Sequence, residues 1–173
     1  VYVFREYGIS RIIAYGRQED FSVDNLFNNV GKIYADTVTE CGKYIIFLSS
    51  TGIYRFNGID FVKILPLYDE YLLGVDNVGA KGVFYNNKFY ISLKMKLDGK
   101  TIEKVILVYD TENKSSYVVR GLKIDDLEVI KNNSYYILAL SNGILCKLNN
   151  SGKRFNKTLN KSWKTFKNDF NLM

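Results

Sequence analysis

A strand–turn–strand segment recurs three times in this 173-residue chain, at offsets of 45 and 46 residues. The three copies span residues 38–48, 83–93 and 129–139, with two-residue turns expected at Cys41-Gly42, Asn86-Asn87 and Asn132-Asn133. Asn and Gly reach positive φ at little cost, which tight hairpins require. A period of about 40 to 50 residues built from short strands is typical of β-propeller blades. This repeat limits the fold more than any other feature of the sequence.

Further strands complete the repeating unit. A third strand is expected after Gly8, Gly52 and Gly143, and at 105–109 after an Asp98-Gly99 hairpin. A fourth strand is expected at 60–64, 116–119 and 154–155, and a short helix within the connection 18–29. The sequence thus predicts an all-β protein, a β-propeller of about three and a half four-stranded antiparallel blades. The expected units are 1–15, 33–75, 78–121 and 125–157, followed by a basic aromatic segment or linker at 158–173.

The composition agrees with a β fold. The chain has 14 Tyr and 11 Phe but one Pro, and aromatic and β-branched side chains favour strands. Two distant cysteines, Cys41 and Cys146, indicate a reducing compartment rather than a disulfide framework. No apolar run is long enough for a membrane span. Because the chain starts inside a strand-like run, Val1–Phe4, it is expected to be part of a larger polypeptide and of a larger propeller.

The residues give little support to catalysis. The chain has no histidine, which excludes Ser-His-Asp and Cys-His sites and most zinc sites. Carboxylates cluster in the connections between expected strands, where Asp forms turns and caps; the clusters are Glu19-Asp20 with Asp24, Asp69-Glu70, and Asp125-Asp126 with Glu128. No enzymatic activity, cofactor or metal site is therefore expected. The enzyme alternative, a glycan hydrolase, would depend on Asp125 or Asp126.

The C-terminal segment is the strongest candidate for an interaction site. Seven Lys or Arg and one acid lie from Lys147 onward, and lysines alternate with aromatic residues. The candidate contact residues are Trp163, Phe166, Lys161, Lys164 and Lys167. The segment has three interpretations: a linker or strand, a basic amphipathic helix that contacts a protein or a membrane surface, or a single-stranded nucleic-acid contact. Nucleic acid is the least favoured of the three.

Two runs suggest a family. Gly31-Lys-Ile-Tyr-Ala-Asp-Thr-Val38 and Tyr44-Ile-Ile-Phe-Leu-Ser-Ser-Thr-Gly-Ile-Tyr-Arg-Phe-Asn-Gly58 resemble a segment of propeller-like virion proteins of tailed bacteriophages, in neck or tail components. The resemblance covers residues 1–60. It implies a structural role in the virion, assembly in the host cytoplasm, and contacts with other virion subunits in a homo-oligomeric ring or a hetero-assembly.

A different class of function, a carbohydrate- or host-surface-binding propeller module, is the alternative. Aromatic side chains at loop ends stack on sugars, and the candidates here are Tyr68, Tyr71, Tyr117 and Trp163. The competing structural interpretation is that the tyrosines fill the space between blades. A glycan array together with Trp163→Ala would separate the two.

Overall fold

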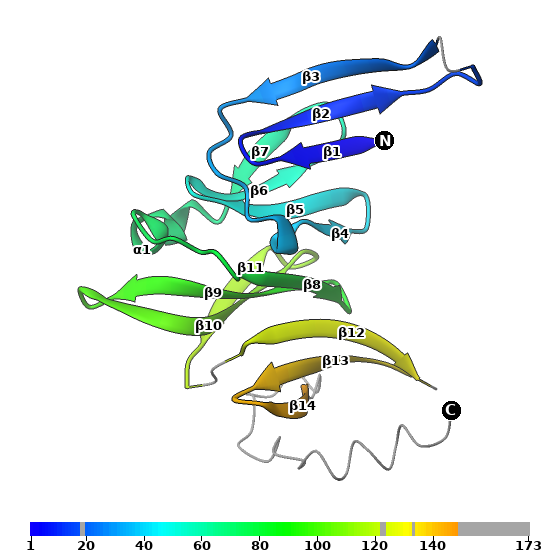
Figure 1. Cartoon of the computed structure of the whole chain (residues 1–173). Coiled ribbons are helices and arrows are strands. Elements are labelled where there is room, and N and C mark those ends of the chain that lie inside the picture. Colours follow the sequence, from blue (N-terminus) through cyan, green and yellow to red (C-terminus); the bar gives the residue numbers. More distant parts are fainter. Residues whose placement is uncertain (18–19, 122–123, 133, 149–173) are drawn as a thin grey trace. The chain divides into compact units, whose positions relative to one another are not determined.

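The computed structural model describes residues 1–17, 20–121, 124–132 and 134–148 (Figure 1). Fourteen strands, two 3-10 turns (η2, Ala35–Thr37, and η3, Pro66–Tyr68) and one short helix (α1, Asp69–Leu72) make up this part of the chain. The strands form four antiparallel sheets, each a meander in which neighbours in sequence pair. The all-β prediction is confirmed.

Each sheet is named by its place in the sequence. Sheet A contains β1 (Tyr2–Arg5), β2 (Gly8–Ile13) and β3 (Ser22–Asn28), and sheet B contains β4 (Thr39–Cys41), β5 (Tyr44–Ser49), β6 (Gly52–Phe56) and β7 (Phe61–Ile64). Sheet C contains β8 (Lys81–Tyr85), β9 (Lys88–Leu97), β10 (Lys100–Asp110) and β11 (Ser115–Val119). Sheet D contains β12 (Asp126–Asn132), β13 (Ser134–Ser141) and β14 (Ile144–Leu148). The arrangement of these sheets around a common axis stays a prediction.

Most of the stretch 18–29, where a short helix was predicted, forms a strand; Asp20 alone of its described residues has a 3-10 conformation, and residues 18–19 lie outside the described part of the chain. The described part of this stretch contains β3, which pairs antiparallel with β2 from Ile13↔Ser22 to Gly8↔Asn28. Val23 and Phe27 favour strands. The neighbouring strand β2 supplies hydrogen-bond partners for the backbone of β3, whereas a short helix without tertiary packing is only marginally stable. The first unit therefore continues past residue 15.

The turns follow the sequence with one shift. Asn86 and Asn87 have φ of 49° and 58° and link a Tyr85↔Lys88 pair, as predicted. In the first copy the paired residues are Cys41↔Tyr44, so the turn is Gly42-Lys43, one residue later than expected. Gly42, with φ of 64°, provides the left-handed conformation there. In the third copy Asn132 pairs with Ser134. Asn133 and the strand expected at 154–155 lie outside the described residues.

The chain divides into two compact units. The first contains Val1–Val78 and the hairpin tip Met95–Thr101, and the second contains the rest. The first unit has a core of Ile9, Val30, Ile33, Phe47 and Phe56, all at most 6% exposed. In the second unit, side chains of sheets C and D form one core, which includes Tyr90, Ile106, Val108, Ile137 and Leu148.

Strand pairing shows which strands of sheet B the three strands of sheet A correspond to. The turn pair Arg5↔Gly8 in sheet A corresponds to Ser49↔Gly52 in sheet B, in agreement with the repeated Gly-Ile sequence at the start of β2 and β6. Hence β1, β2 and β3 correspond to the second, third and fourth strands of sheet B. Sheet D, by contrast, contains the first three strands of the unit within the described residues.

Candidate interaction face on sheet A

Aromatic side chains pack sheet A against sheet B inside the first unit. Phe4 meets Phe47 edge-on with ring centroids 5.3 Å apart, and Tyr2 meets Phe56 at 5.0 Å. Phe27 adds edge-on contacts with Phe56 at 6.1 Å and Phe61 at 4.8 Å. Such edge-on pairs align the positive ring edge with the negative ring face. We call the face of sheet A that makes these contacts its inner face.

The receiving face of sheet B is built from two cross-strand rows. One row is Ile45↔Phe56↔Phe61, and the other begins with Phe47↔Tyr54. All five side chains belong to the core of the first unit or pack against it. Cross-strand neighbours share one face of a sheet, so the register of β5, β6 and β7 brings these residues together against sheet A.

Sheet A carries the same two rows on its opposite face. Val1 and Ile12 exchange two backbone hydrogen bonds, at 2.8 and 2.9 Å, and Ile12 pairs with Val23. The next row is Val3↔Ser10↔Asn25. We call the surface formed by Val1, Val3, Ile12 and Val23 the outer face of sheet A. In the repeat, these four residues occupy the same positions as the following residues of sheet B, in the same order: Ile45, Phe47, Phe56 and Phe61.

The outer face of sheet A is open to solvent, unlike its counterpart in sheet B. Val1 is 85% exposed, Val23 64% and Val3 36%, whereas Phe47 and Phe56 are at most 1% exposed. Its polar members bond to each other: Ser10 donates to Asn25 Oδ1 at 2.9 Å, and Arg5 donates to Asn28 Oδ1 at 3.0 Å. The outer face thus combines an apolar row with polar side chains that bond to each other.

Sheet A differs from sheet B at the outer edge of β1 within the described residues. Because Val1↔Ile12 is a hydrogen-bonded pair, alternation places the backbone polar groups of Tyr2 and Phe4 on the side away from β2. Among the described residues no strand pairs there, since sheet A has the order β1-β2-β3. In sheet B the corresponding strand, β5, is paired on both sides, by β4 and β6. Unpaired strand edges are sites for addition of another strand.

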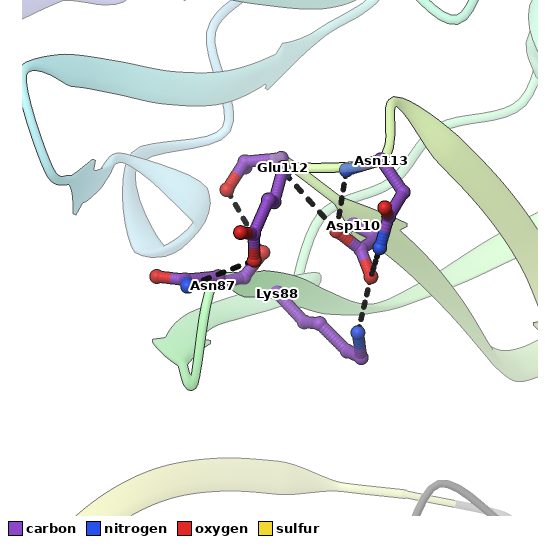
Figure 2. A network of polar contacts seen from close by, with 6 residues as sticks. Asn87, Lys88, Asp110, Glu112 and Asn113 are labelled. Carbon is purple, nitrogen blue, oxygen red and sulfur yellow. Dashed lines mark hydrogen bonds and ion pairs between the residues drawn. The ribbon is translucent and has the colours of Figure 1, made fainter.

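A polar network in sheet C has a structural role (Figure 2). Asp110, at the end of β10, accepts hydrogen bonds from the backbone N–H groups of Glu112 and Asn113 at 3.0 and 2.9 Å, and from the ammonium group of Lys88. The backbone hydrogen bond from Asn113 and the Lys88 contact lower the pKa of Asp110. Asn87 meanwhile donates to Glu112 at 3.3 Å. The carboxylate thus fixes the turn between β10 and β11.

Three carboxylates of the clusters predicted from the sequence contact lysines or accept hydrogen bonds from backbone N–H groups. Asp69 accepts from Lys63 Nζ at 2.8 Å. Asp125 contacts Lys104 and accepts from the backbone N–H of Asn142 at 2.9 Å, and Asp126 accepts from the N–H of Leu127 at 2.9 Å. Within the described ranges no group of three metal-binding side chains comes together.

The predicted sugar-stacking tyrosines are divided between the units. Tyr68 and Tyr71 are neighbours in the first unit, with tilted rings 6.4 Å apart, and a hydrogen bond with Glu70 raises the pKa of Tyr71. Tyr117, on β11 of the second unit, is 45% exposed. Trp163 lies outside the described residues, as do the other predicted contact residues, Phe166, Lys161, Lys164 and Lys167.

The outer face of sheet A escaped the sequence analysis although its signal was present. Aligning Gly8 with Gly52 in the sequence already gives Ile12 and Phe56 the same position in the repeat, and likewise Val3 and Phe47. What was missing was β3, which adds Val23 to the row. Cys41 is 4% exposed, and burial raises the pKa of its thiol to about 12. It is therefore unreactive as a nucleophile.

In the part of the chain that the structure describes, no helix has the length and apolar character to cross a membrane. No family model matches the sequence, and no curated protein matches it either.

Proposed function

We propose that this protein is a structural subunit that works through protein–protein contacts, with its sheets arranged as propeller blades. One observation carries the proposal: the outer face of sheet A exposes Val1, Val3 and Val23 at positions whose counterparts in sheet B are packed. Adjacent exposed apolar side chains on a sheet mark an interaction surface more often than scattered ones do.

The setting that we propose for this role is the virion of a tailed bacteriophage, in a neck or tail component. Its support is the resemblance of residues 31–38 and 44–58 to virion proteins of that class. Subunits of such particles form rings and stacks, and a surface of the kind found on sheet A suits that assembly. The partners proposed are further virion subunits, either copies of this chain or different proteins.

Sedimentation velocity over a wide protein concentration range tests the proposal. Association of the intact 20.0 kDa chain should grow with concentration, and Val23→Asp should weaken it because a charge on the outer face must then be desolvated. Val62→Asp is the matched control. Val62 is 43% exposed on β7, is paired with Arg55, and corresponds to Asp24, which bonds to Arg11 in sheet A. A chain that stays monomeric at every concentration would contradict the proposal.

A further inference from the structure

Two extensions of the repeat come together in the first unit. The connection 65–80 between β7 and β8 contains η3 and α1 and is longer than the connection 29–38 between β3 and β4. The hairpin of β9 and β10 has strands of 10 and 11 residues, against 6 and 5 in the hairpin of β5 and β6. Its tip, residues 95–101, belongs to the same compact unit as residues 65–78 of the connection. Insertions into a repeat often carry a binding site, because the core of the repeat does not need them.

The connection carries a pair of tyrosine rings. The ring centroids of Tyr68 and Tyr71 lie 6.4 Å apart, and the rings are tilted by 54°. Both side chains are half-buried, and their neighbours Leu67 and Leu73 are 74% and 72% exposed. Every other ring pair in the described residues lies in sheets A and B. The Tyr68–Tyr71 pair thus lies outside the aromatic packing of those sheets and borders solvent.

Polar groups from both extensions lie near this pair. A hydrogen bond with Glu70 and, less strongly, the negative charge of Asp98 at the hairpin tip raise the pKa of Tyr71. The ammonium group of Lys96 lies beside Gly74, where an added Cβ would be 3.5 Å from Nζ. Glu70, Lys96 and Asp98 are all exposed. The carboxylates can accept hydrogen bonds there, and the ammonium group can donate them.

We propose that Tyr68 and Tyr71, together with Glu70 and the hairpin-tip residues Asp98 and Lys96, bind a carbohydrate. The C–H groups of a sugar ring carry partial positive charge and pack on the negative face of an aromatic ring. Its hydroxyl groups both donate and accept hydrogen bonds, which suits carboxylates and an ammonium group side by side. A quaternary ammonium ligand, which aromatic rings enclose, fits less well because these two rings contact each other. The site shares no residue with the outer face of sheet A, so this inference does not depend on the proposed function.

An array of neutral and acidic oligosaccharides, probed with the intact chain, tests the proposal, and calorimetric titration then measures the affinity for the strongest-binding saccharide. Tyr68→Ala and Tyr71→Ala should each weaken binding about tenfold or more, because each removes a ring on which the sugar stacks. Tyr71→Phe keeps the ring and should bind within about threefold of the unmodified chain. Tyr15→Ala is the matched control, since Tyr15 is 72% exposed in the same unit, and it should leave the affinity unchanged.

Thermal melts establish that each variant is folded. If an alanine variant unfolds, Glu70→Gln on an exposed side chain provides the test and should weaken binding about threefold or more. A blank array overturns the proposal, and so does an affinity that the folded variants of Tyr68, Tyr71 and Glu70 leave unchanged. Loss of binding in Tyr117→Ala instead would place the saccharide in the second unit and also overturn it. Displacement of the saccharide by choline chloride would overturn the assignment of the site to carbohydrate.

Discussion

Replacing Phe56 by alanine should destabilise the first unit more than any other single truncation in the contact between sheets A and B. Phe56 is 1% exposed and its ring makes edge-on contacts with Tyr2, Phe4 and Phe27, at 5.0, 5.9 and 6.1 Å. Removing a buried Phe side chain costs about 3 to 5 kcal/mol through lost burial and the cavity that remains. Three aromatic partners favour the upper half of that range.

This loss is large compared with the stability of a domain, which is about 5 to 15 kcal/mol in total. Val62→Ala is the matched control, because Val62 is 43% exposed on β7 and leaves no cavity. It should cost less than about 1 kcal/mol. The two variants therefore differ by several kcal/mol if the packing of sheets A and B is as described.

Native-state hydrogen exchange read by mass spectrometry suits a chain with two units, because a single denaturation curve would combine both. Peptides that cover β1, β2 and β5 report the opening free energy of the first unit. Peptides from β9 up to Lys94, and from β10 from Ile102 onward, report the opening free energy of the second unit. Phe56→Ala should accelerate exchange in the first set far more than in the second. A loss below about 1 kcal/mol in the first set would refute the aromatic contact between sheets A and B.

Three further outcomes are expected. In Cys146→Ser, the remaining Cys41 should react with a thiol reagent at pH 8 much more slowly than in the denatured chain, because burial raises its pKa to about 12; equal rates would contradict its burial. Asp110→Asn should lower stability at pH 7 in urea titrations. The difference should begin to shrink as the pH falls below about 4 and continue to shrink toward the lowered folded-state pKa, because the carboxylate stabilises fully above the unfolded pKa and loses this effect as the pH falls through the folded one. A difference as large at pH 2 as at pH 7 would contradict this role. Gly8→Ala should lower the melting temperature more than Gly16→Ala, because a Cβ at position 8 would lie 2.5 Å from a backbone carbonyl oxygen, whereas at position 16, which has open space, only the positive φ of 73° disfavours alanine; a smaller shift for Gly8→Ala would argue against the close approach of β2 and β3.

The sequence predicted strands well where local signals and tertiary pairing agree. Asn86-Asn87 and Asp98-Gly99 form hairpin turns as expected, since these residues adopt positive φ readily. The one-residue shift to Gly42-Lys43 has a simple cause: both Cys41-Gly42 and Gly42-Lys43 contain the glycine, and only the pairing of Cys41 with Tyr44 distinguishes them.

Strand β3, in the stretch where a helix was predicted, shows which information a single sequence lacks. Asp20, Ser22 and Asp24 before apolar residues match a helix start, but Asp24 instead bonds to Arg11 at 2.7 Å across the sheet. That partner is 13 residues away along the chain, so no local pattern could reveal it. Missing β3 meant missing Val23, and with it the outer face of sheet A.

The contact residues predicted from the sequence lie outside the described residues, so their role stays a prediction. Charge and aromatic composition directed attention to Trp163 and its lysines, for which the structure provides no test. The outer face of sheet A has little charge and only modest hydrophobicity. Its significance appears only when Val1, Ile12 and Val23 are compared, position by position, with the packed row of sheet B.

Carbene footprinting of the unmodified chain at low and high concentration tests most directly whether the outer face of sheet A is a docking surface. Labelling of Val1, Val3 and Val23, which are 85%, 36% and 64% exposed, should fall as concentration rises, while labelling of Val62 and of Ile59, which is 84% exposed, should stay constant. Unchanged labelling of the three valines in a sample that sedimentation shows to be associated would contradict a docking role for this face.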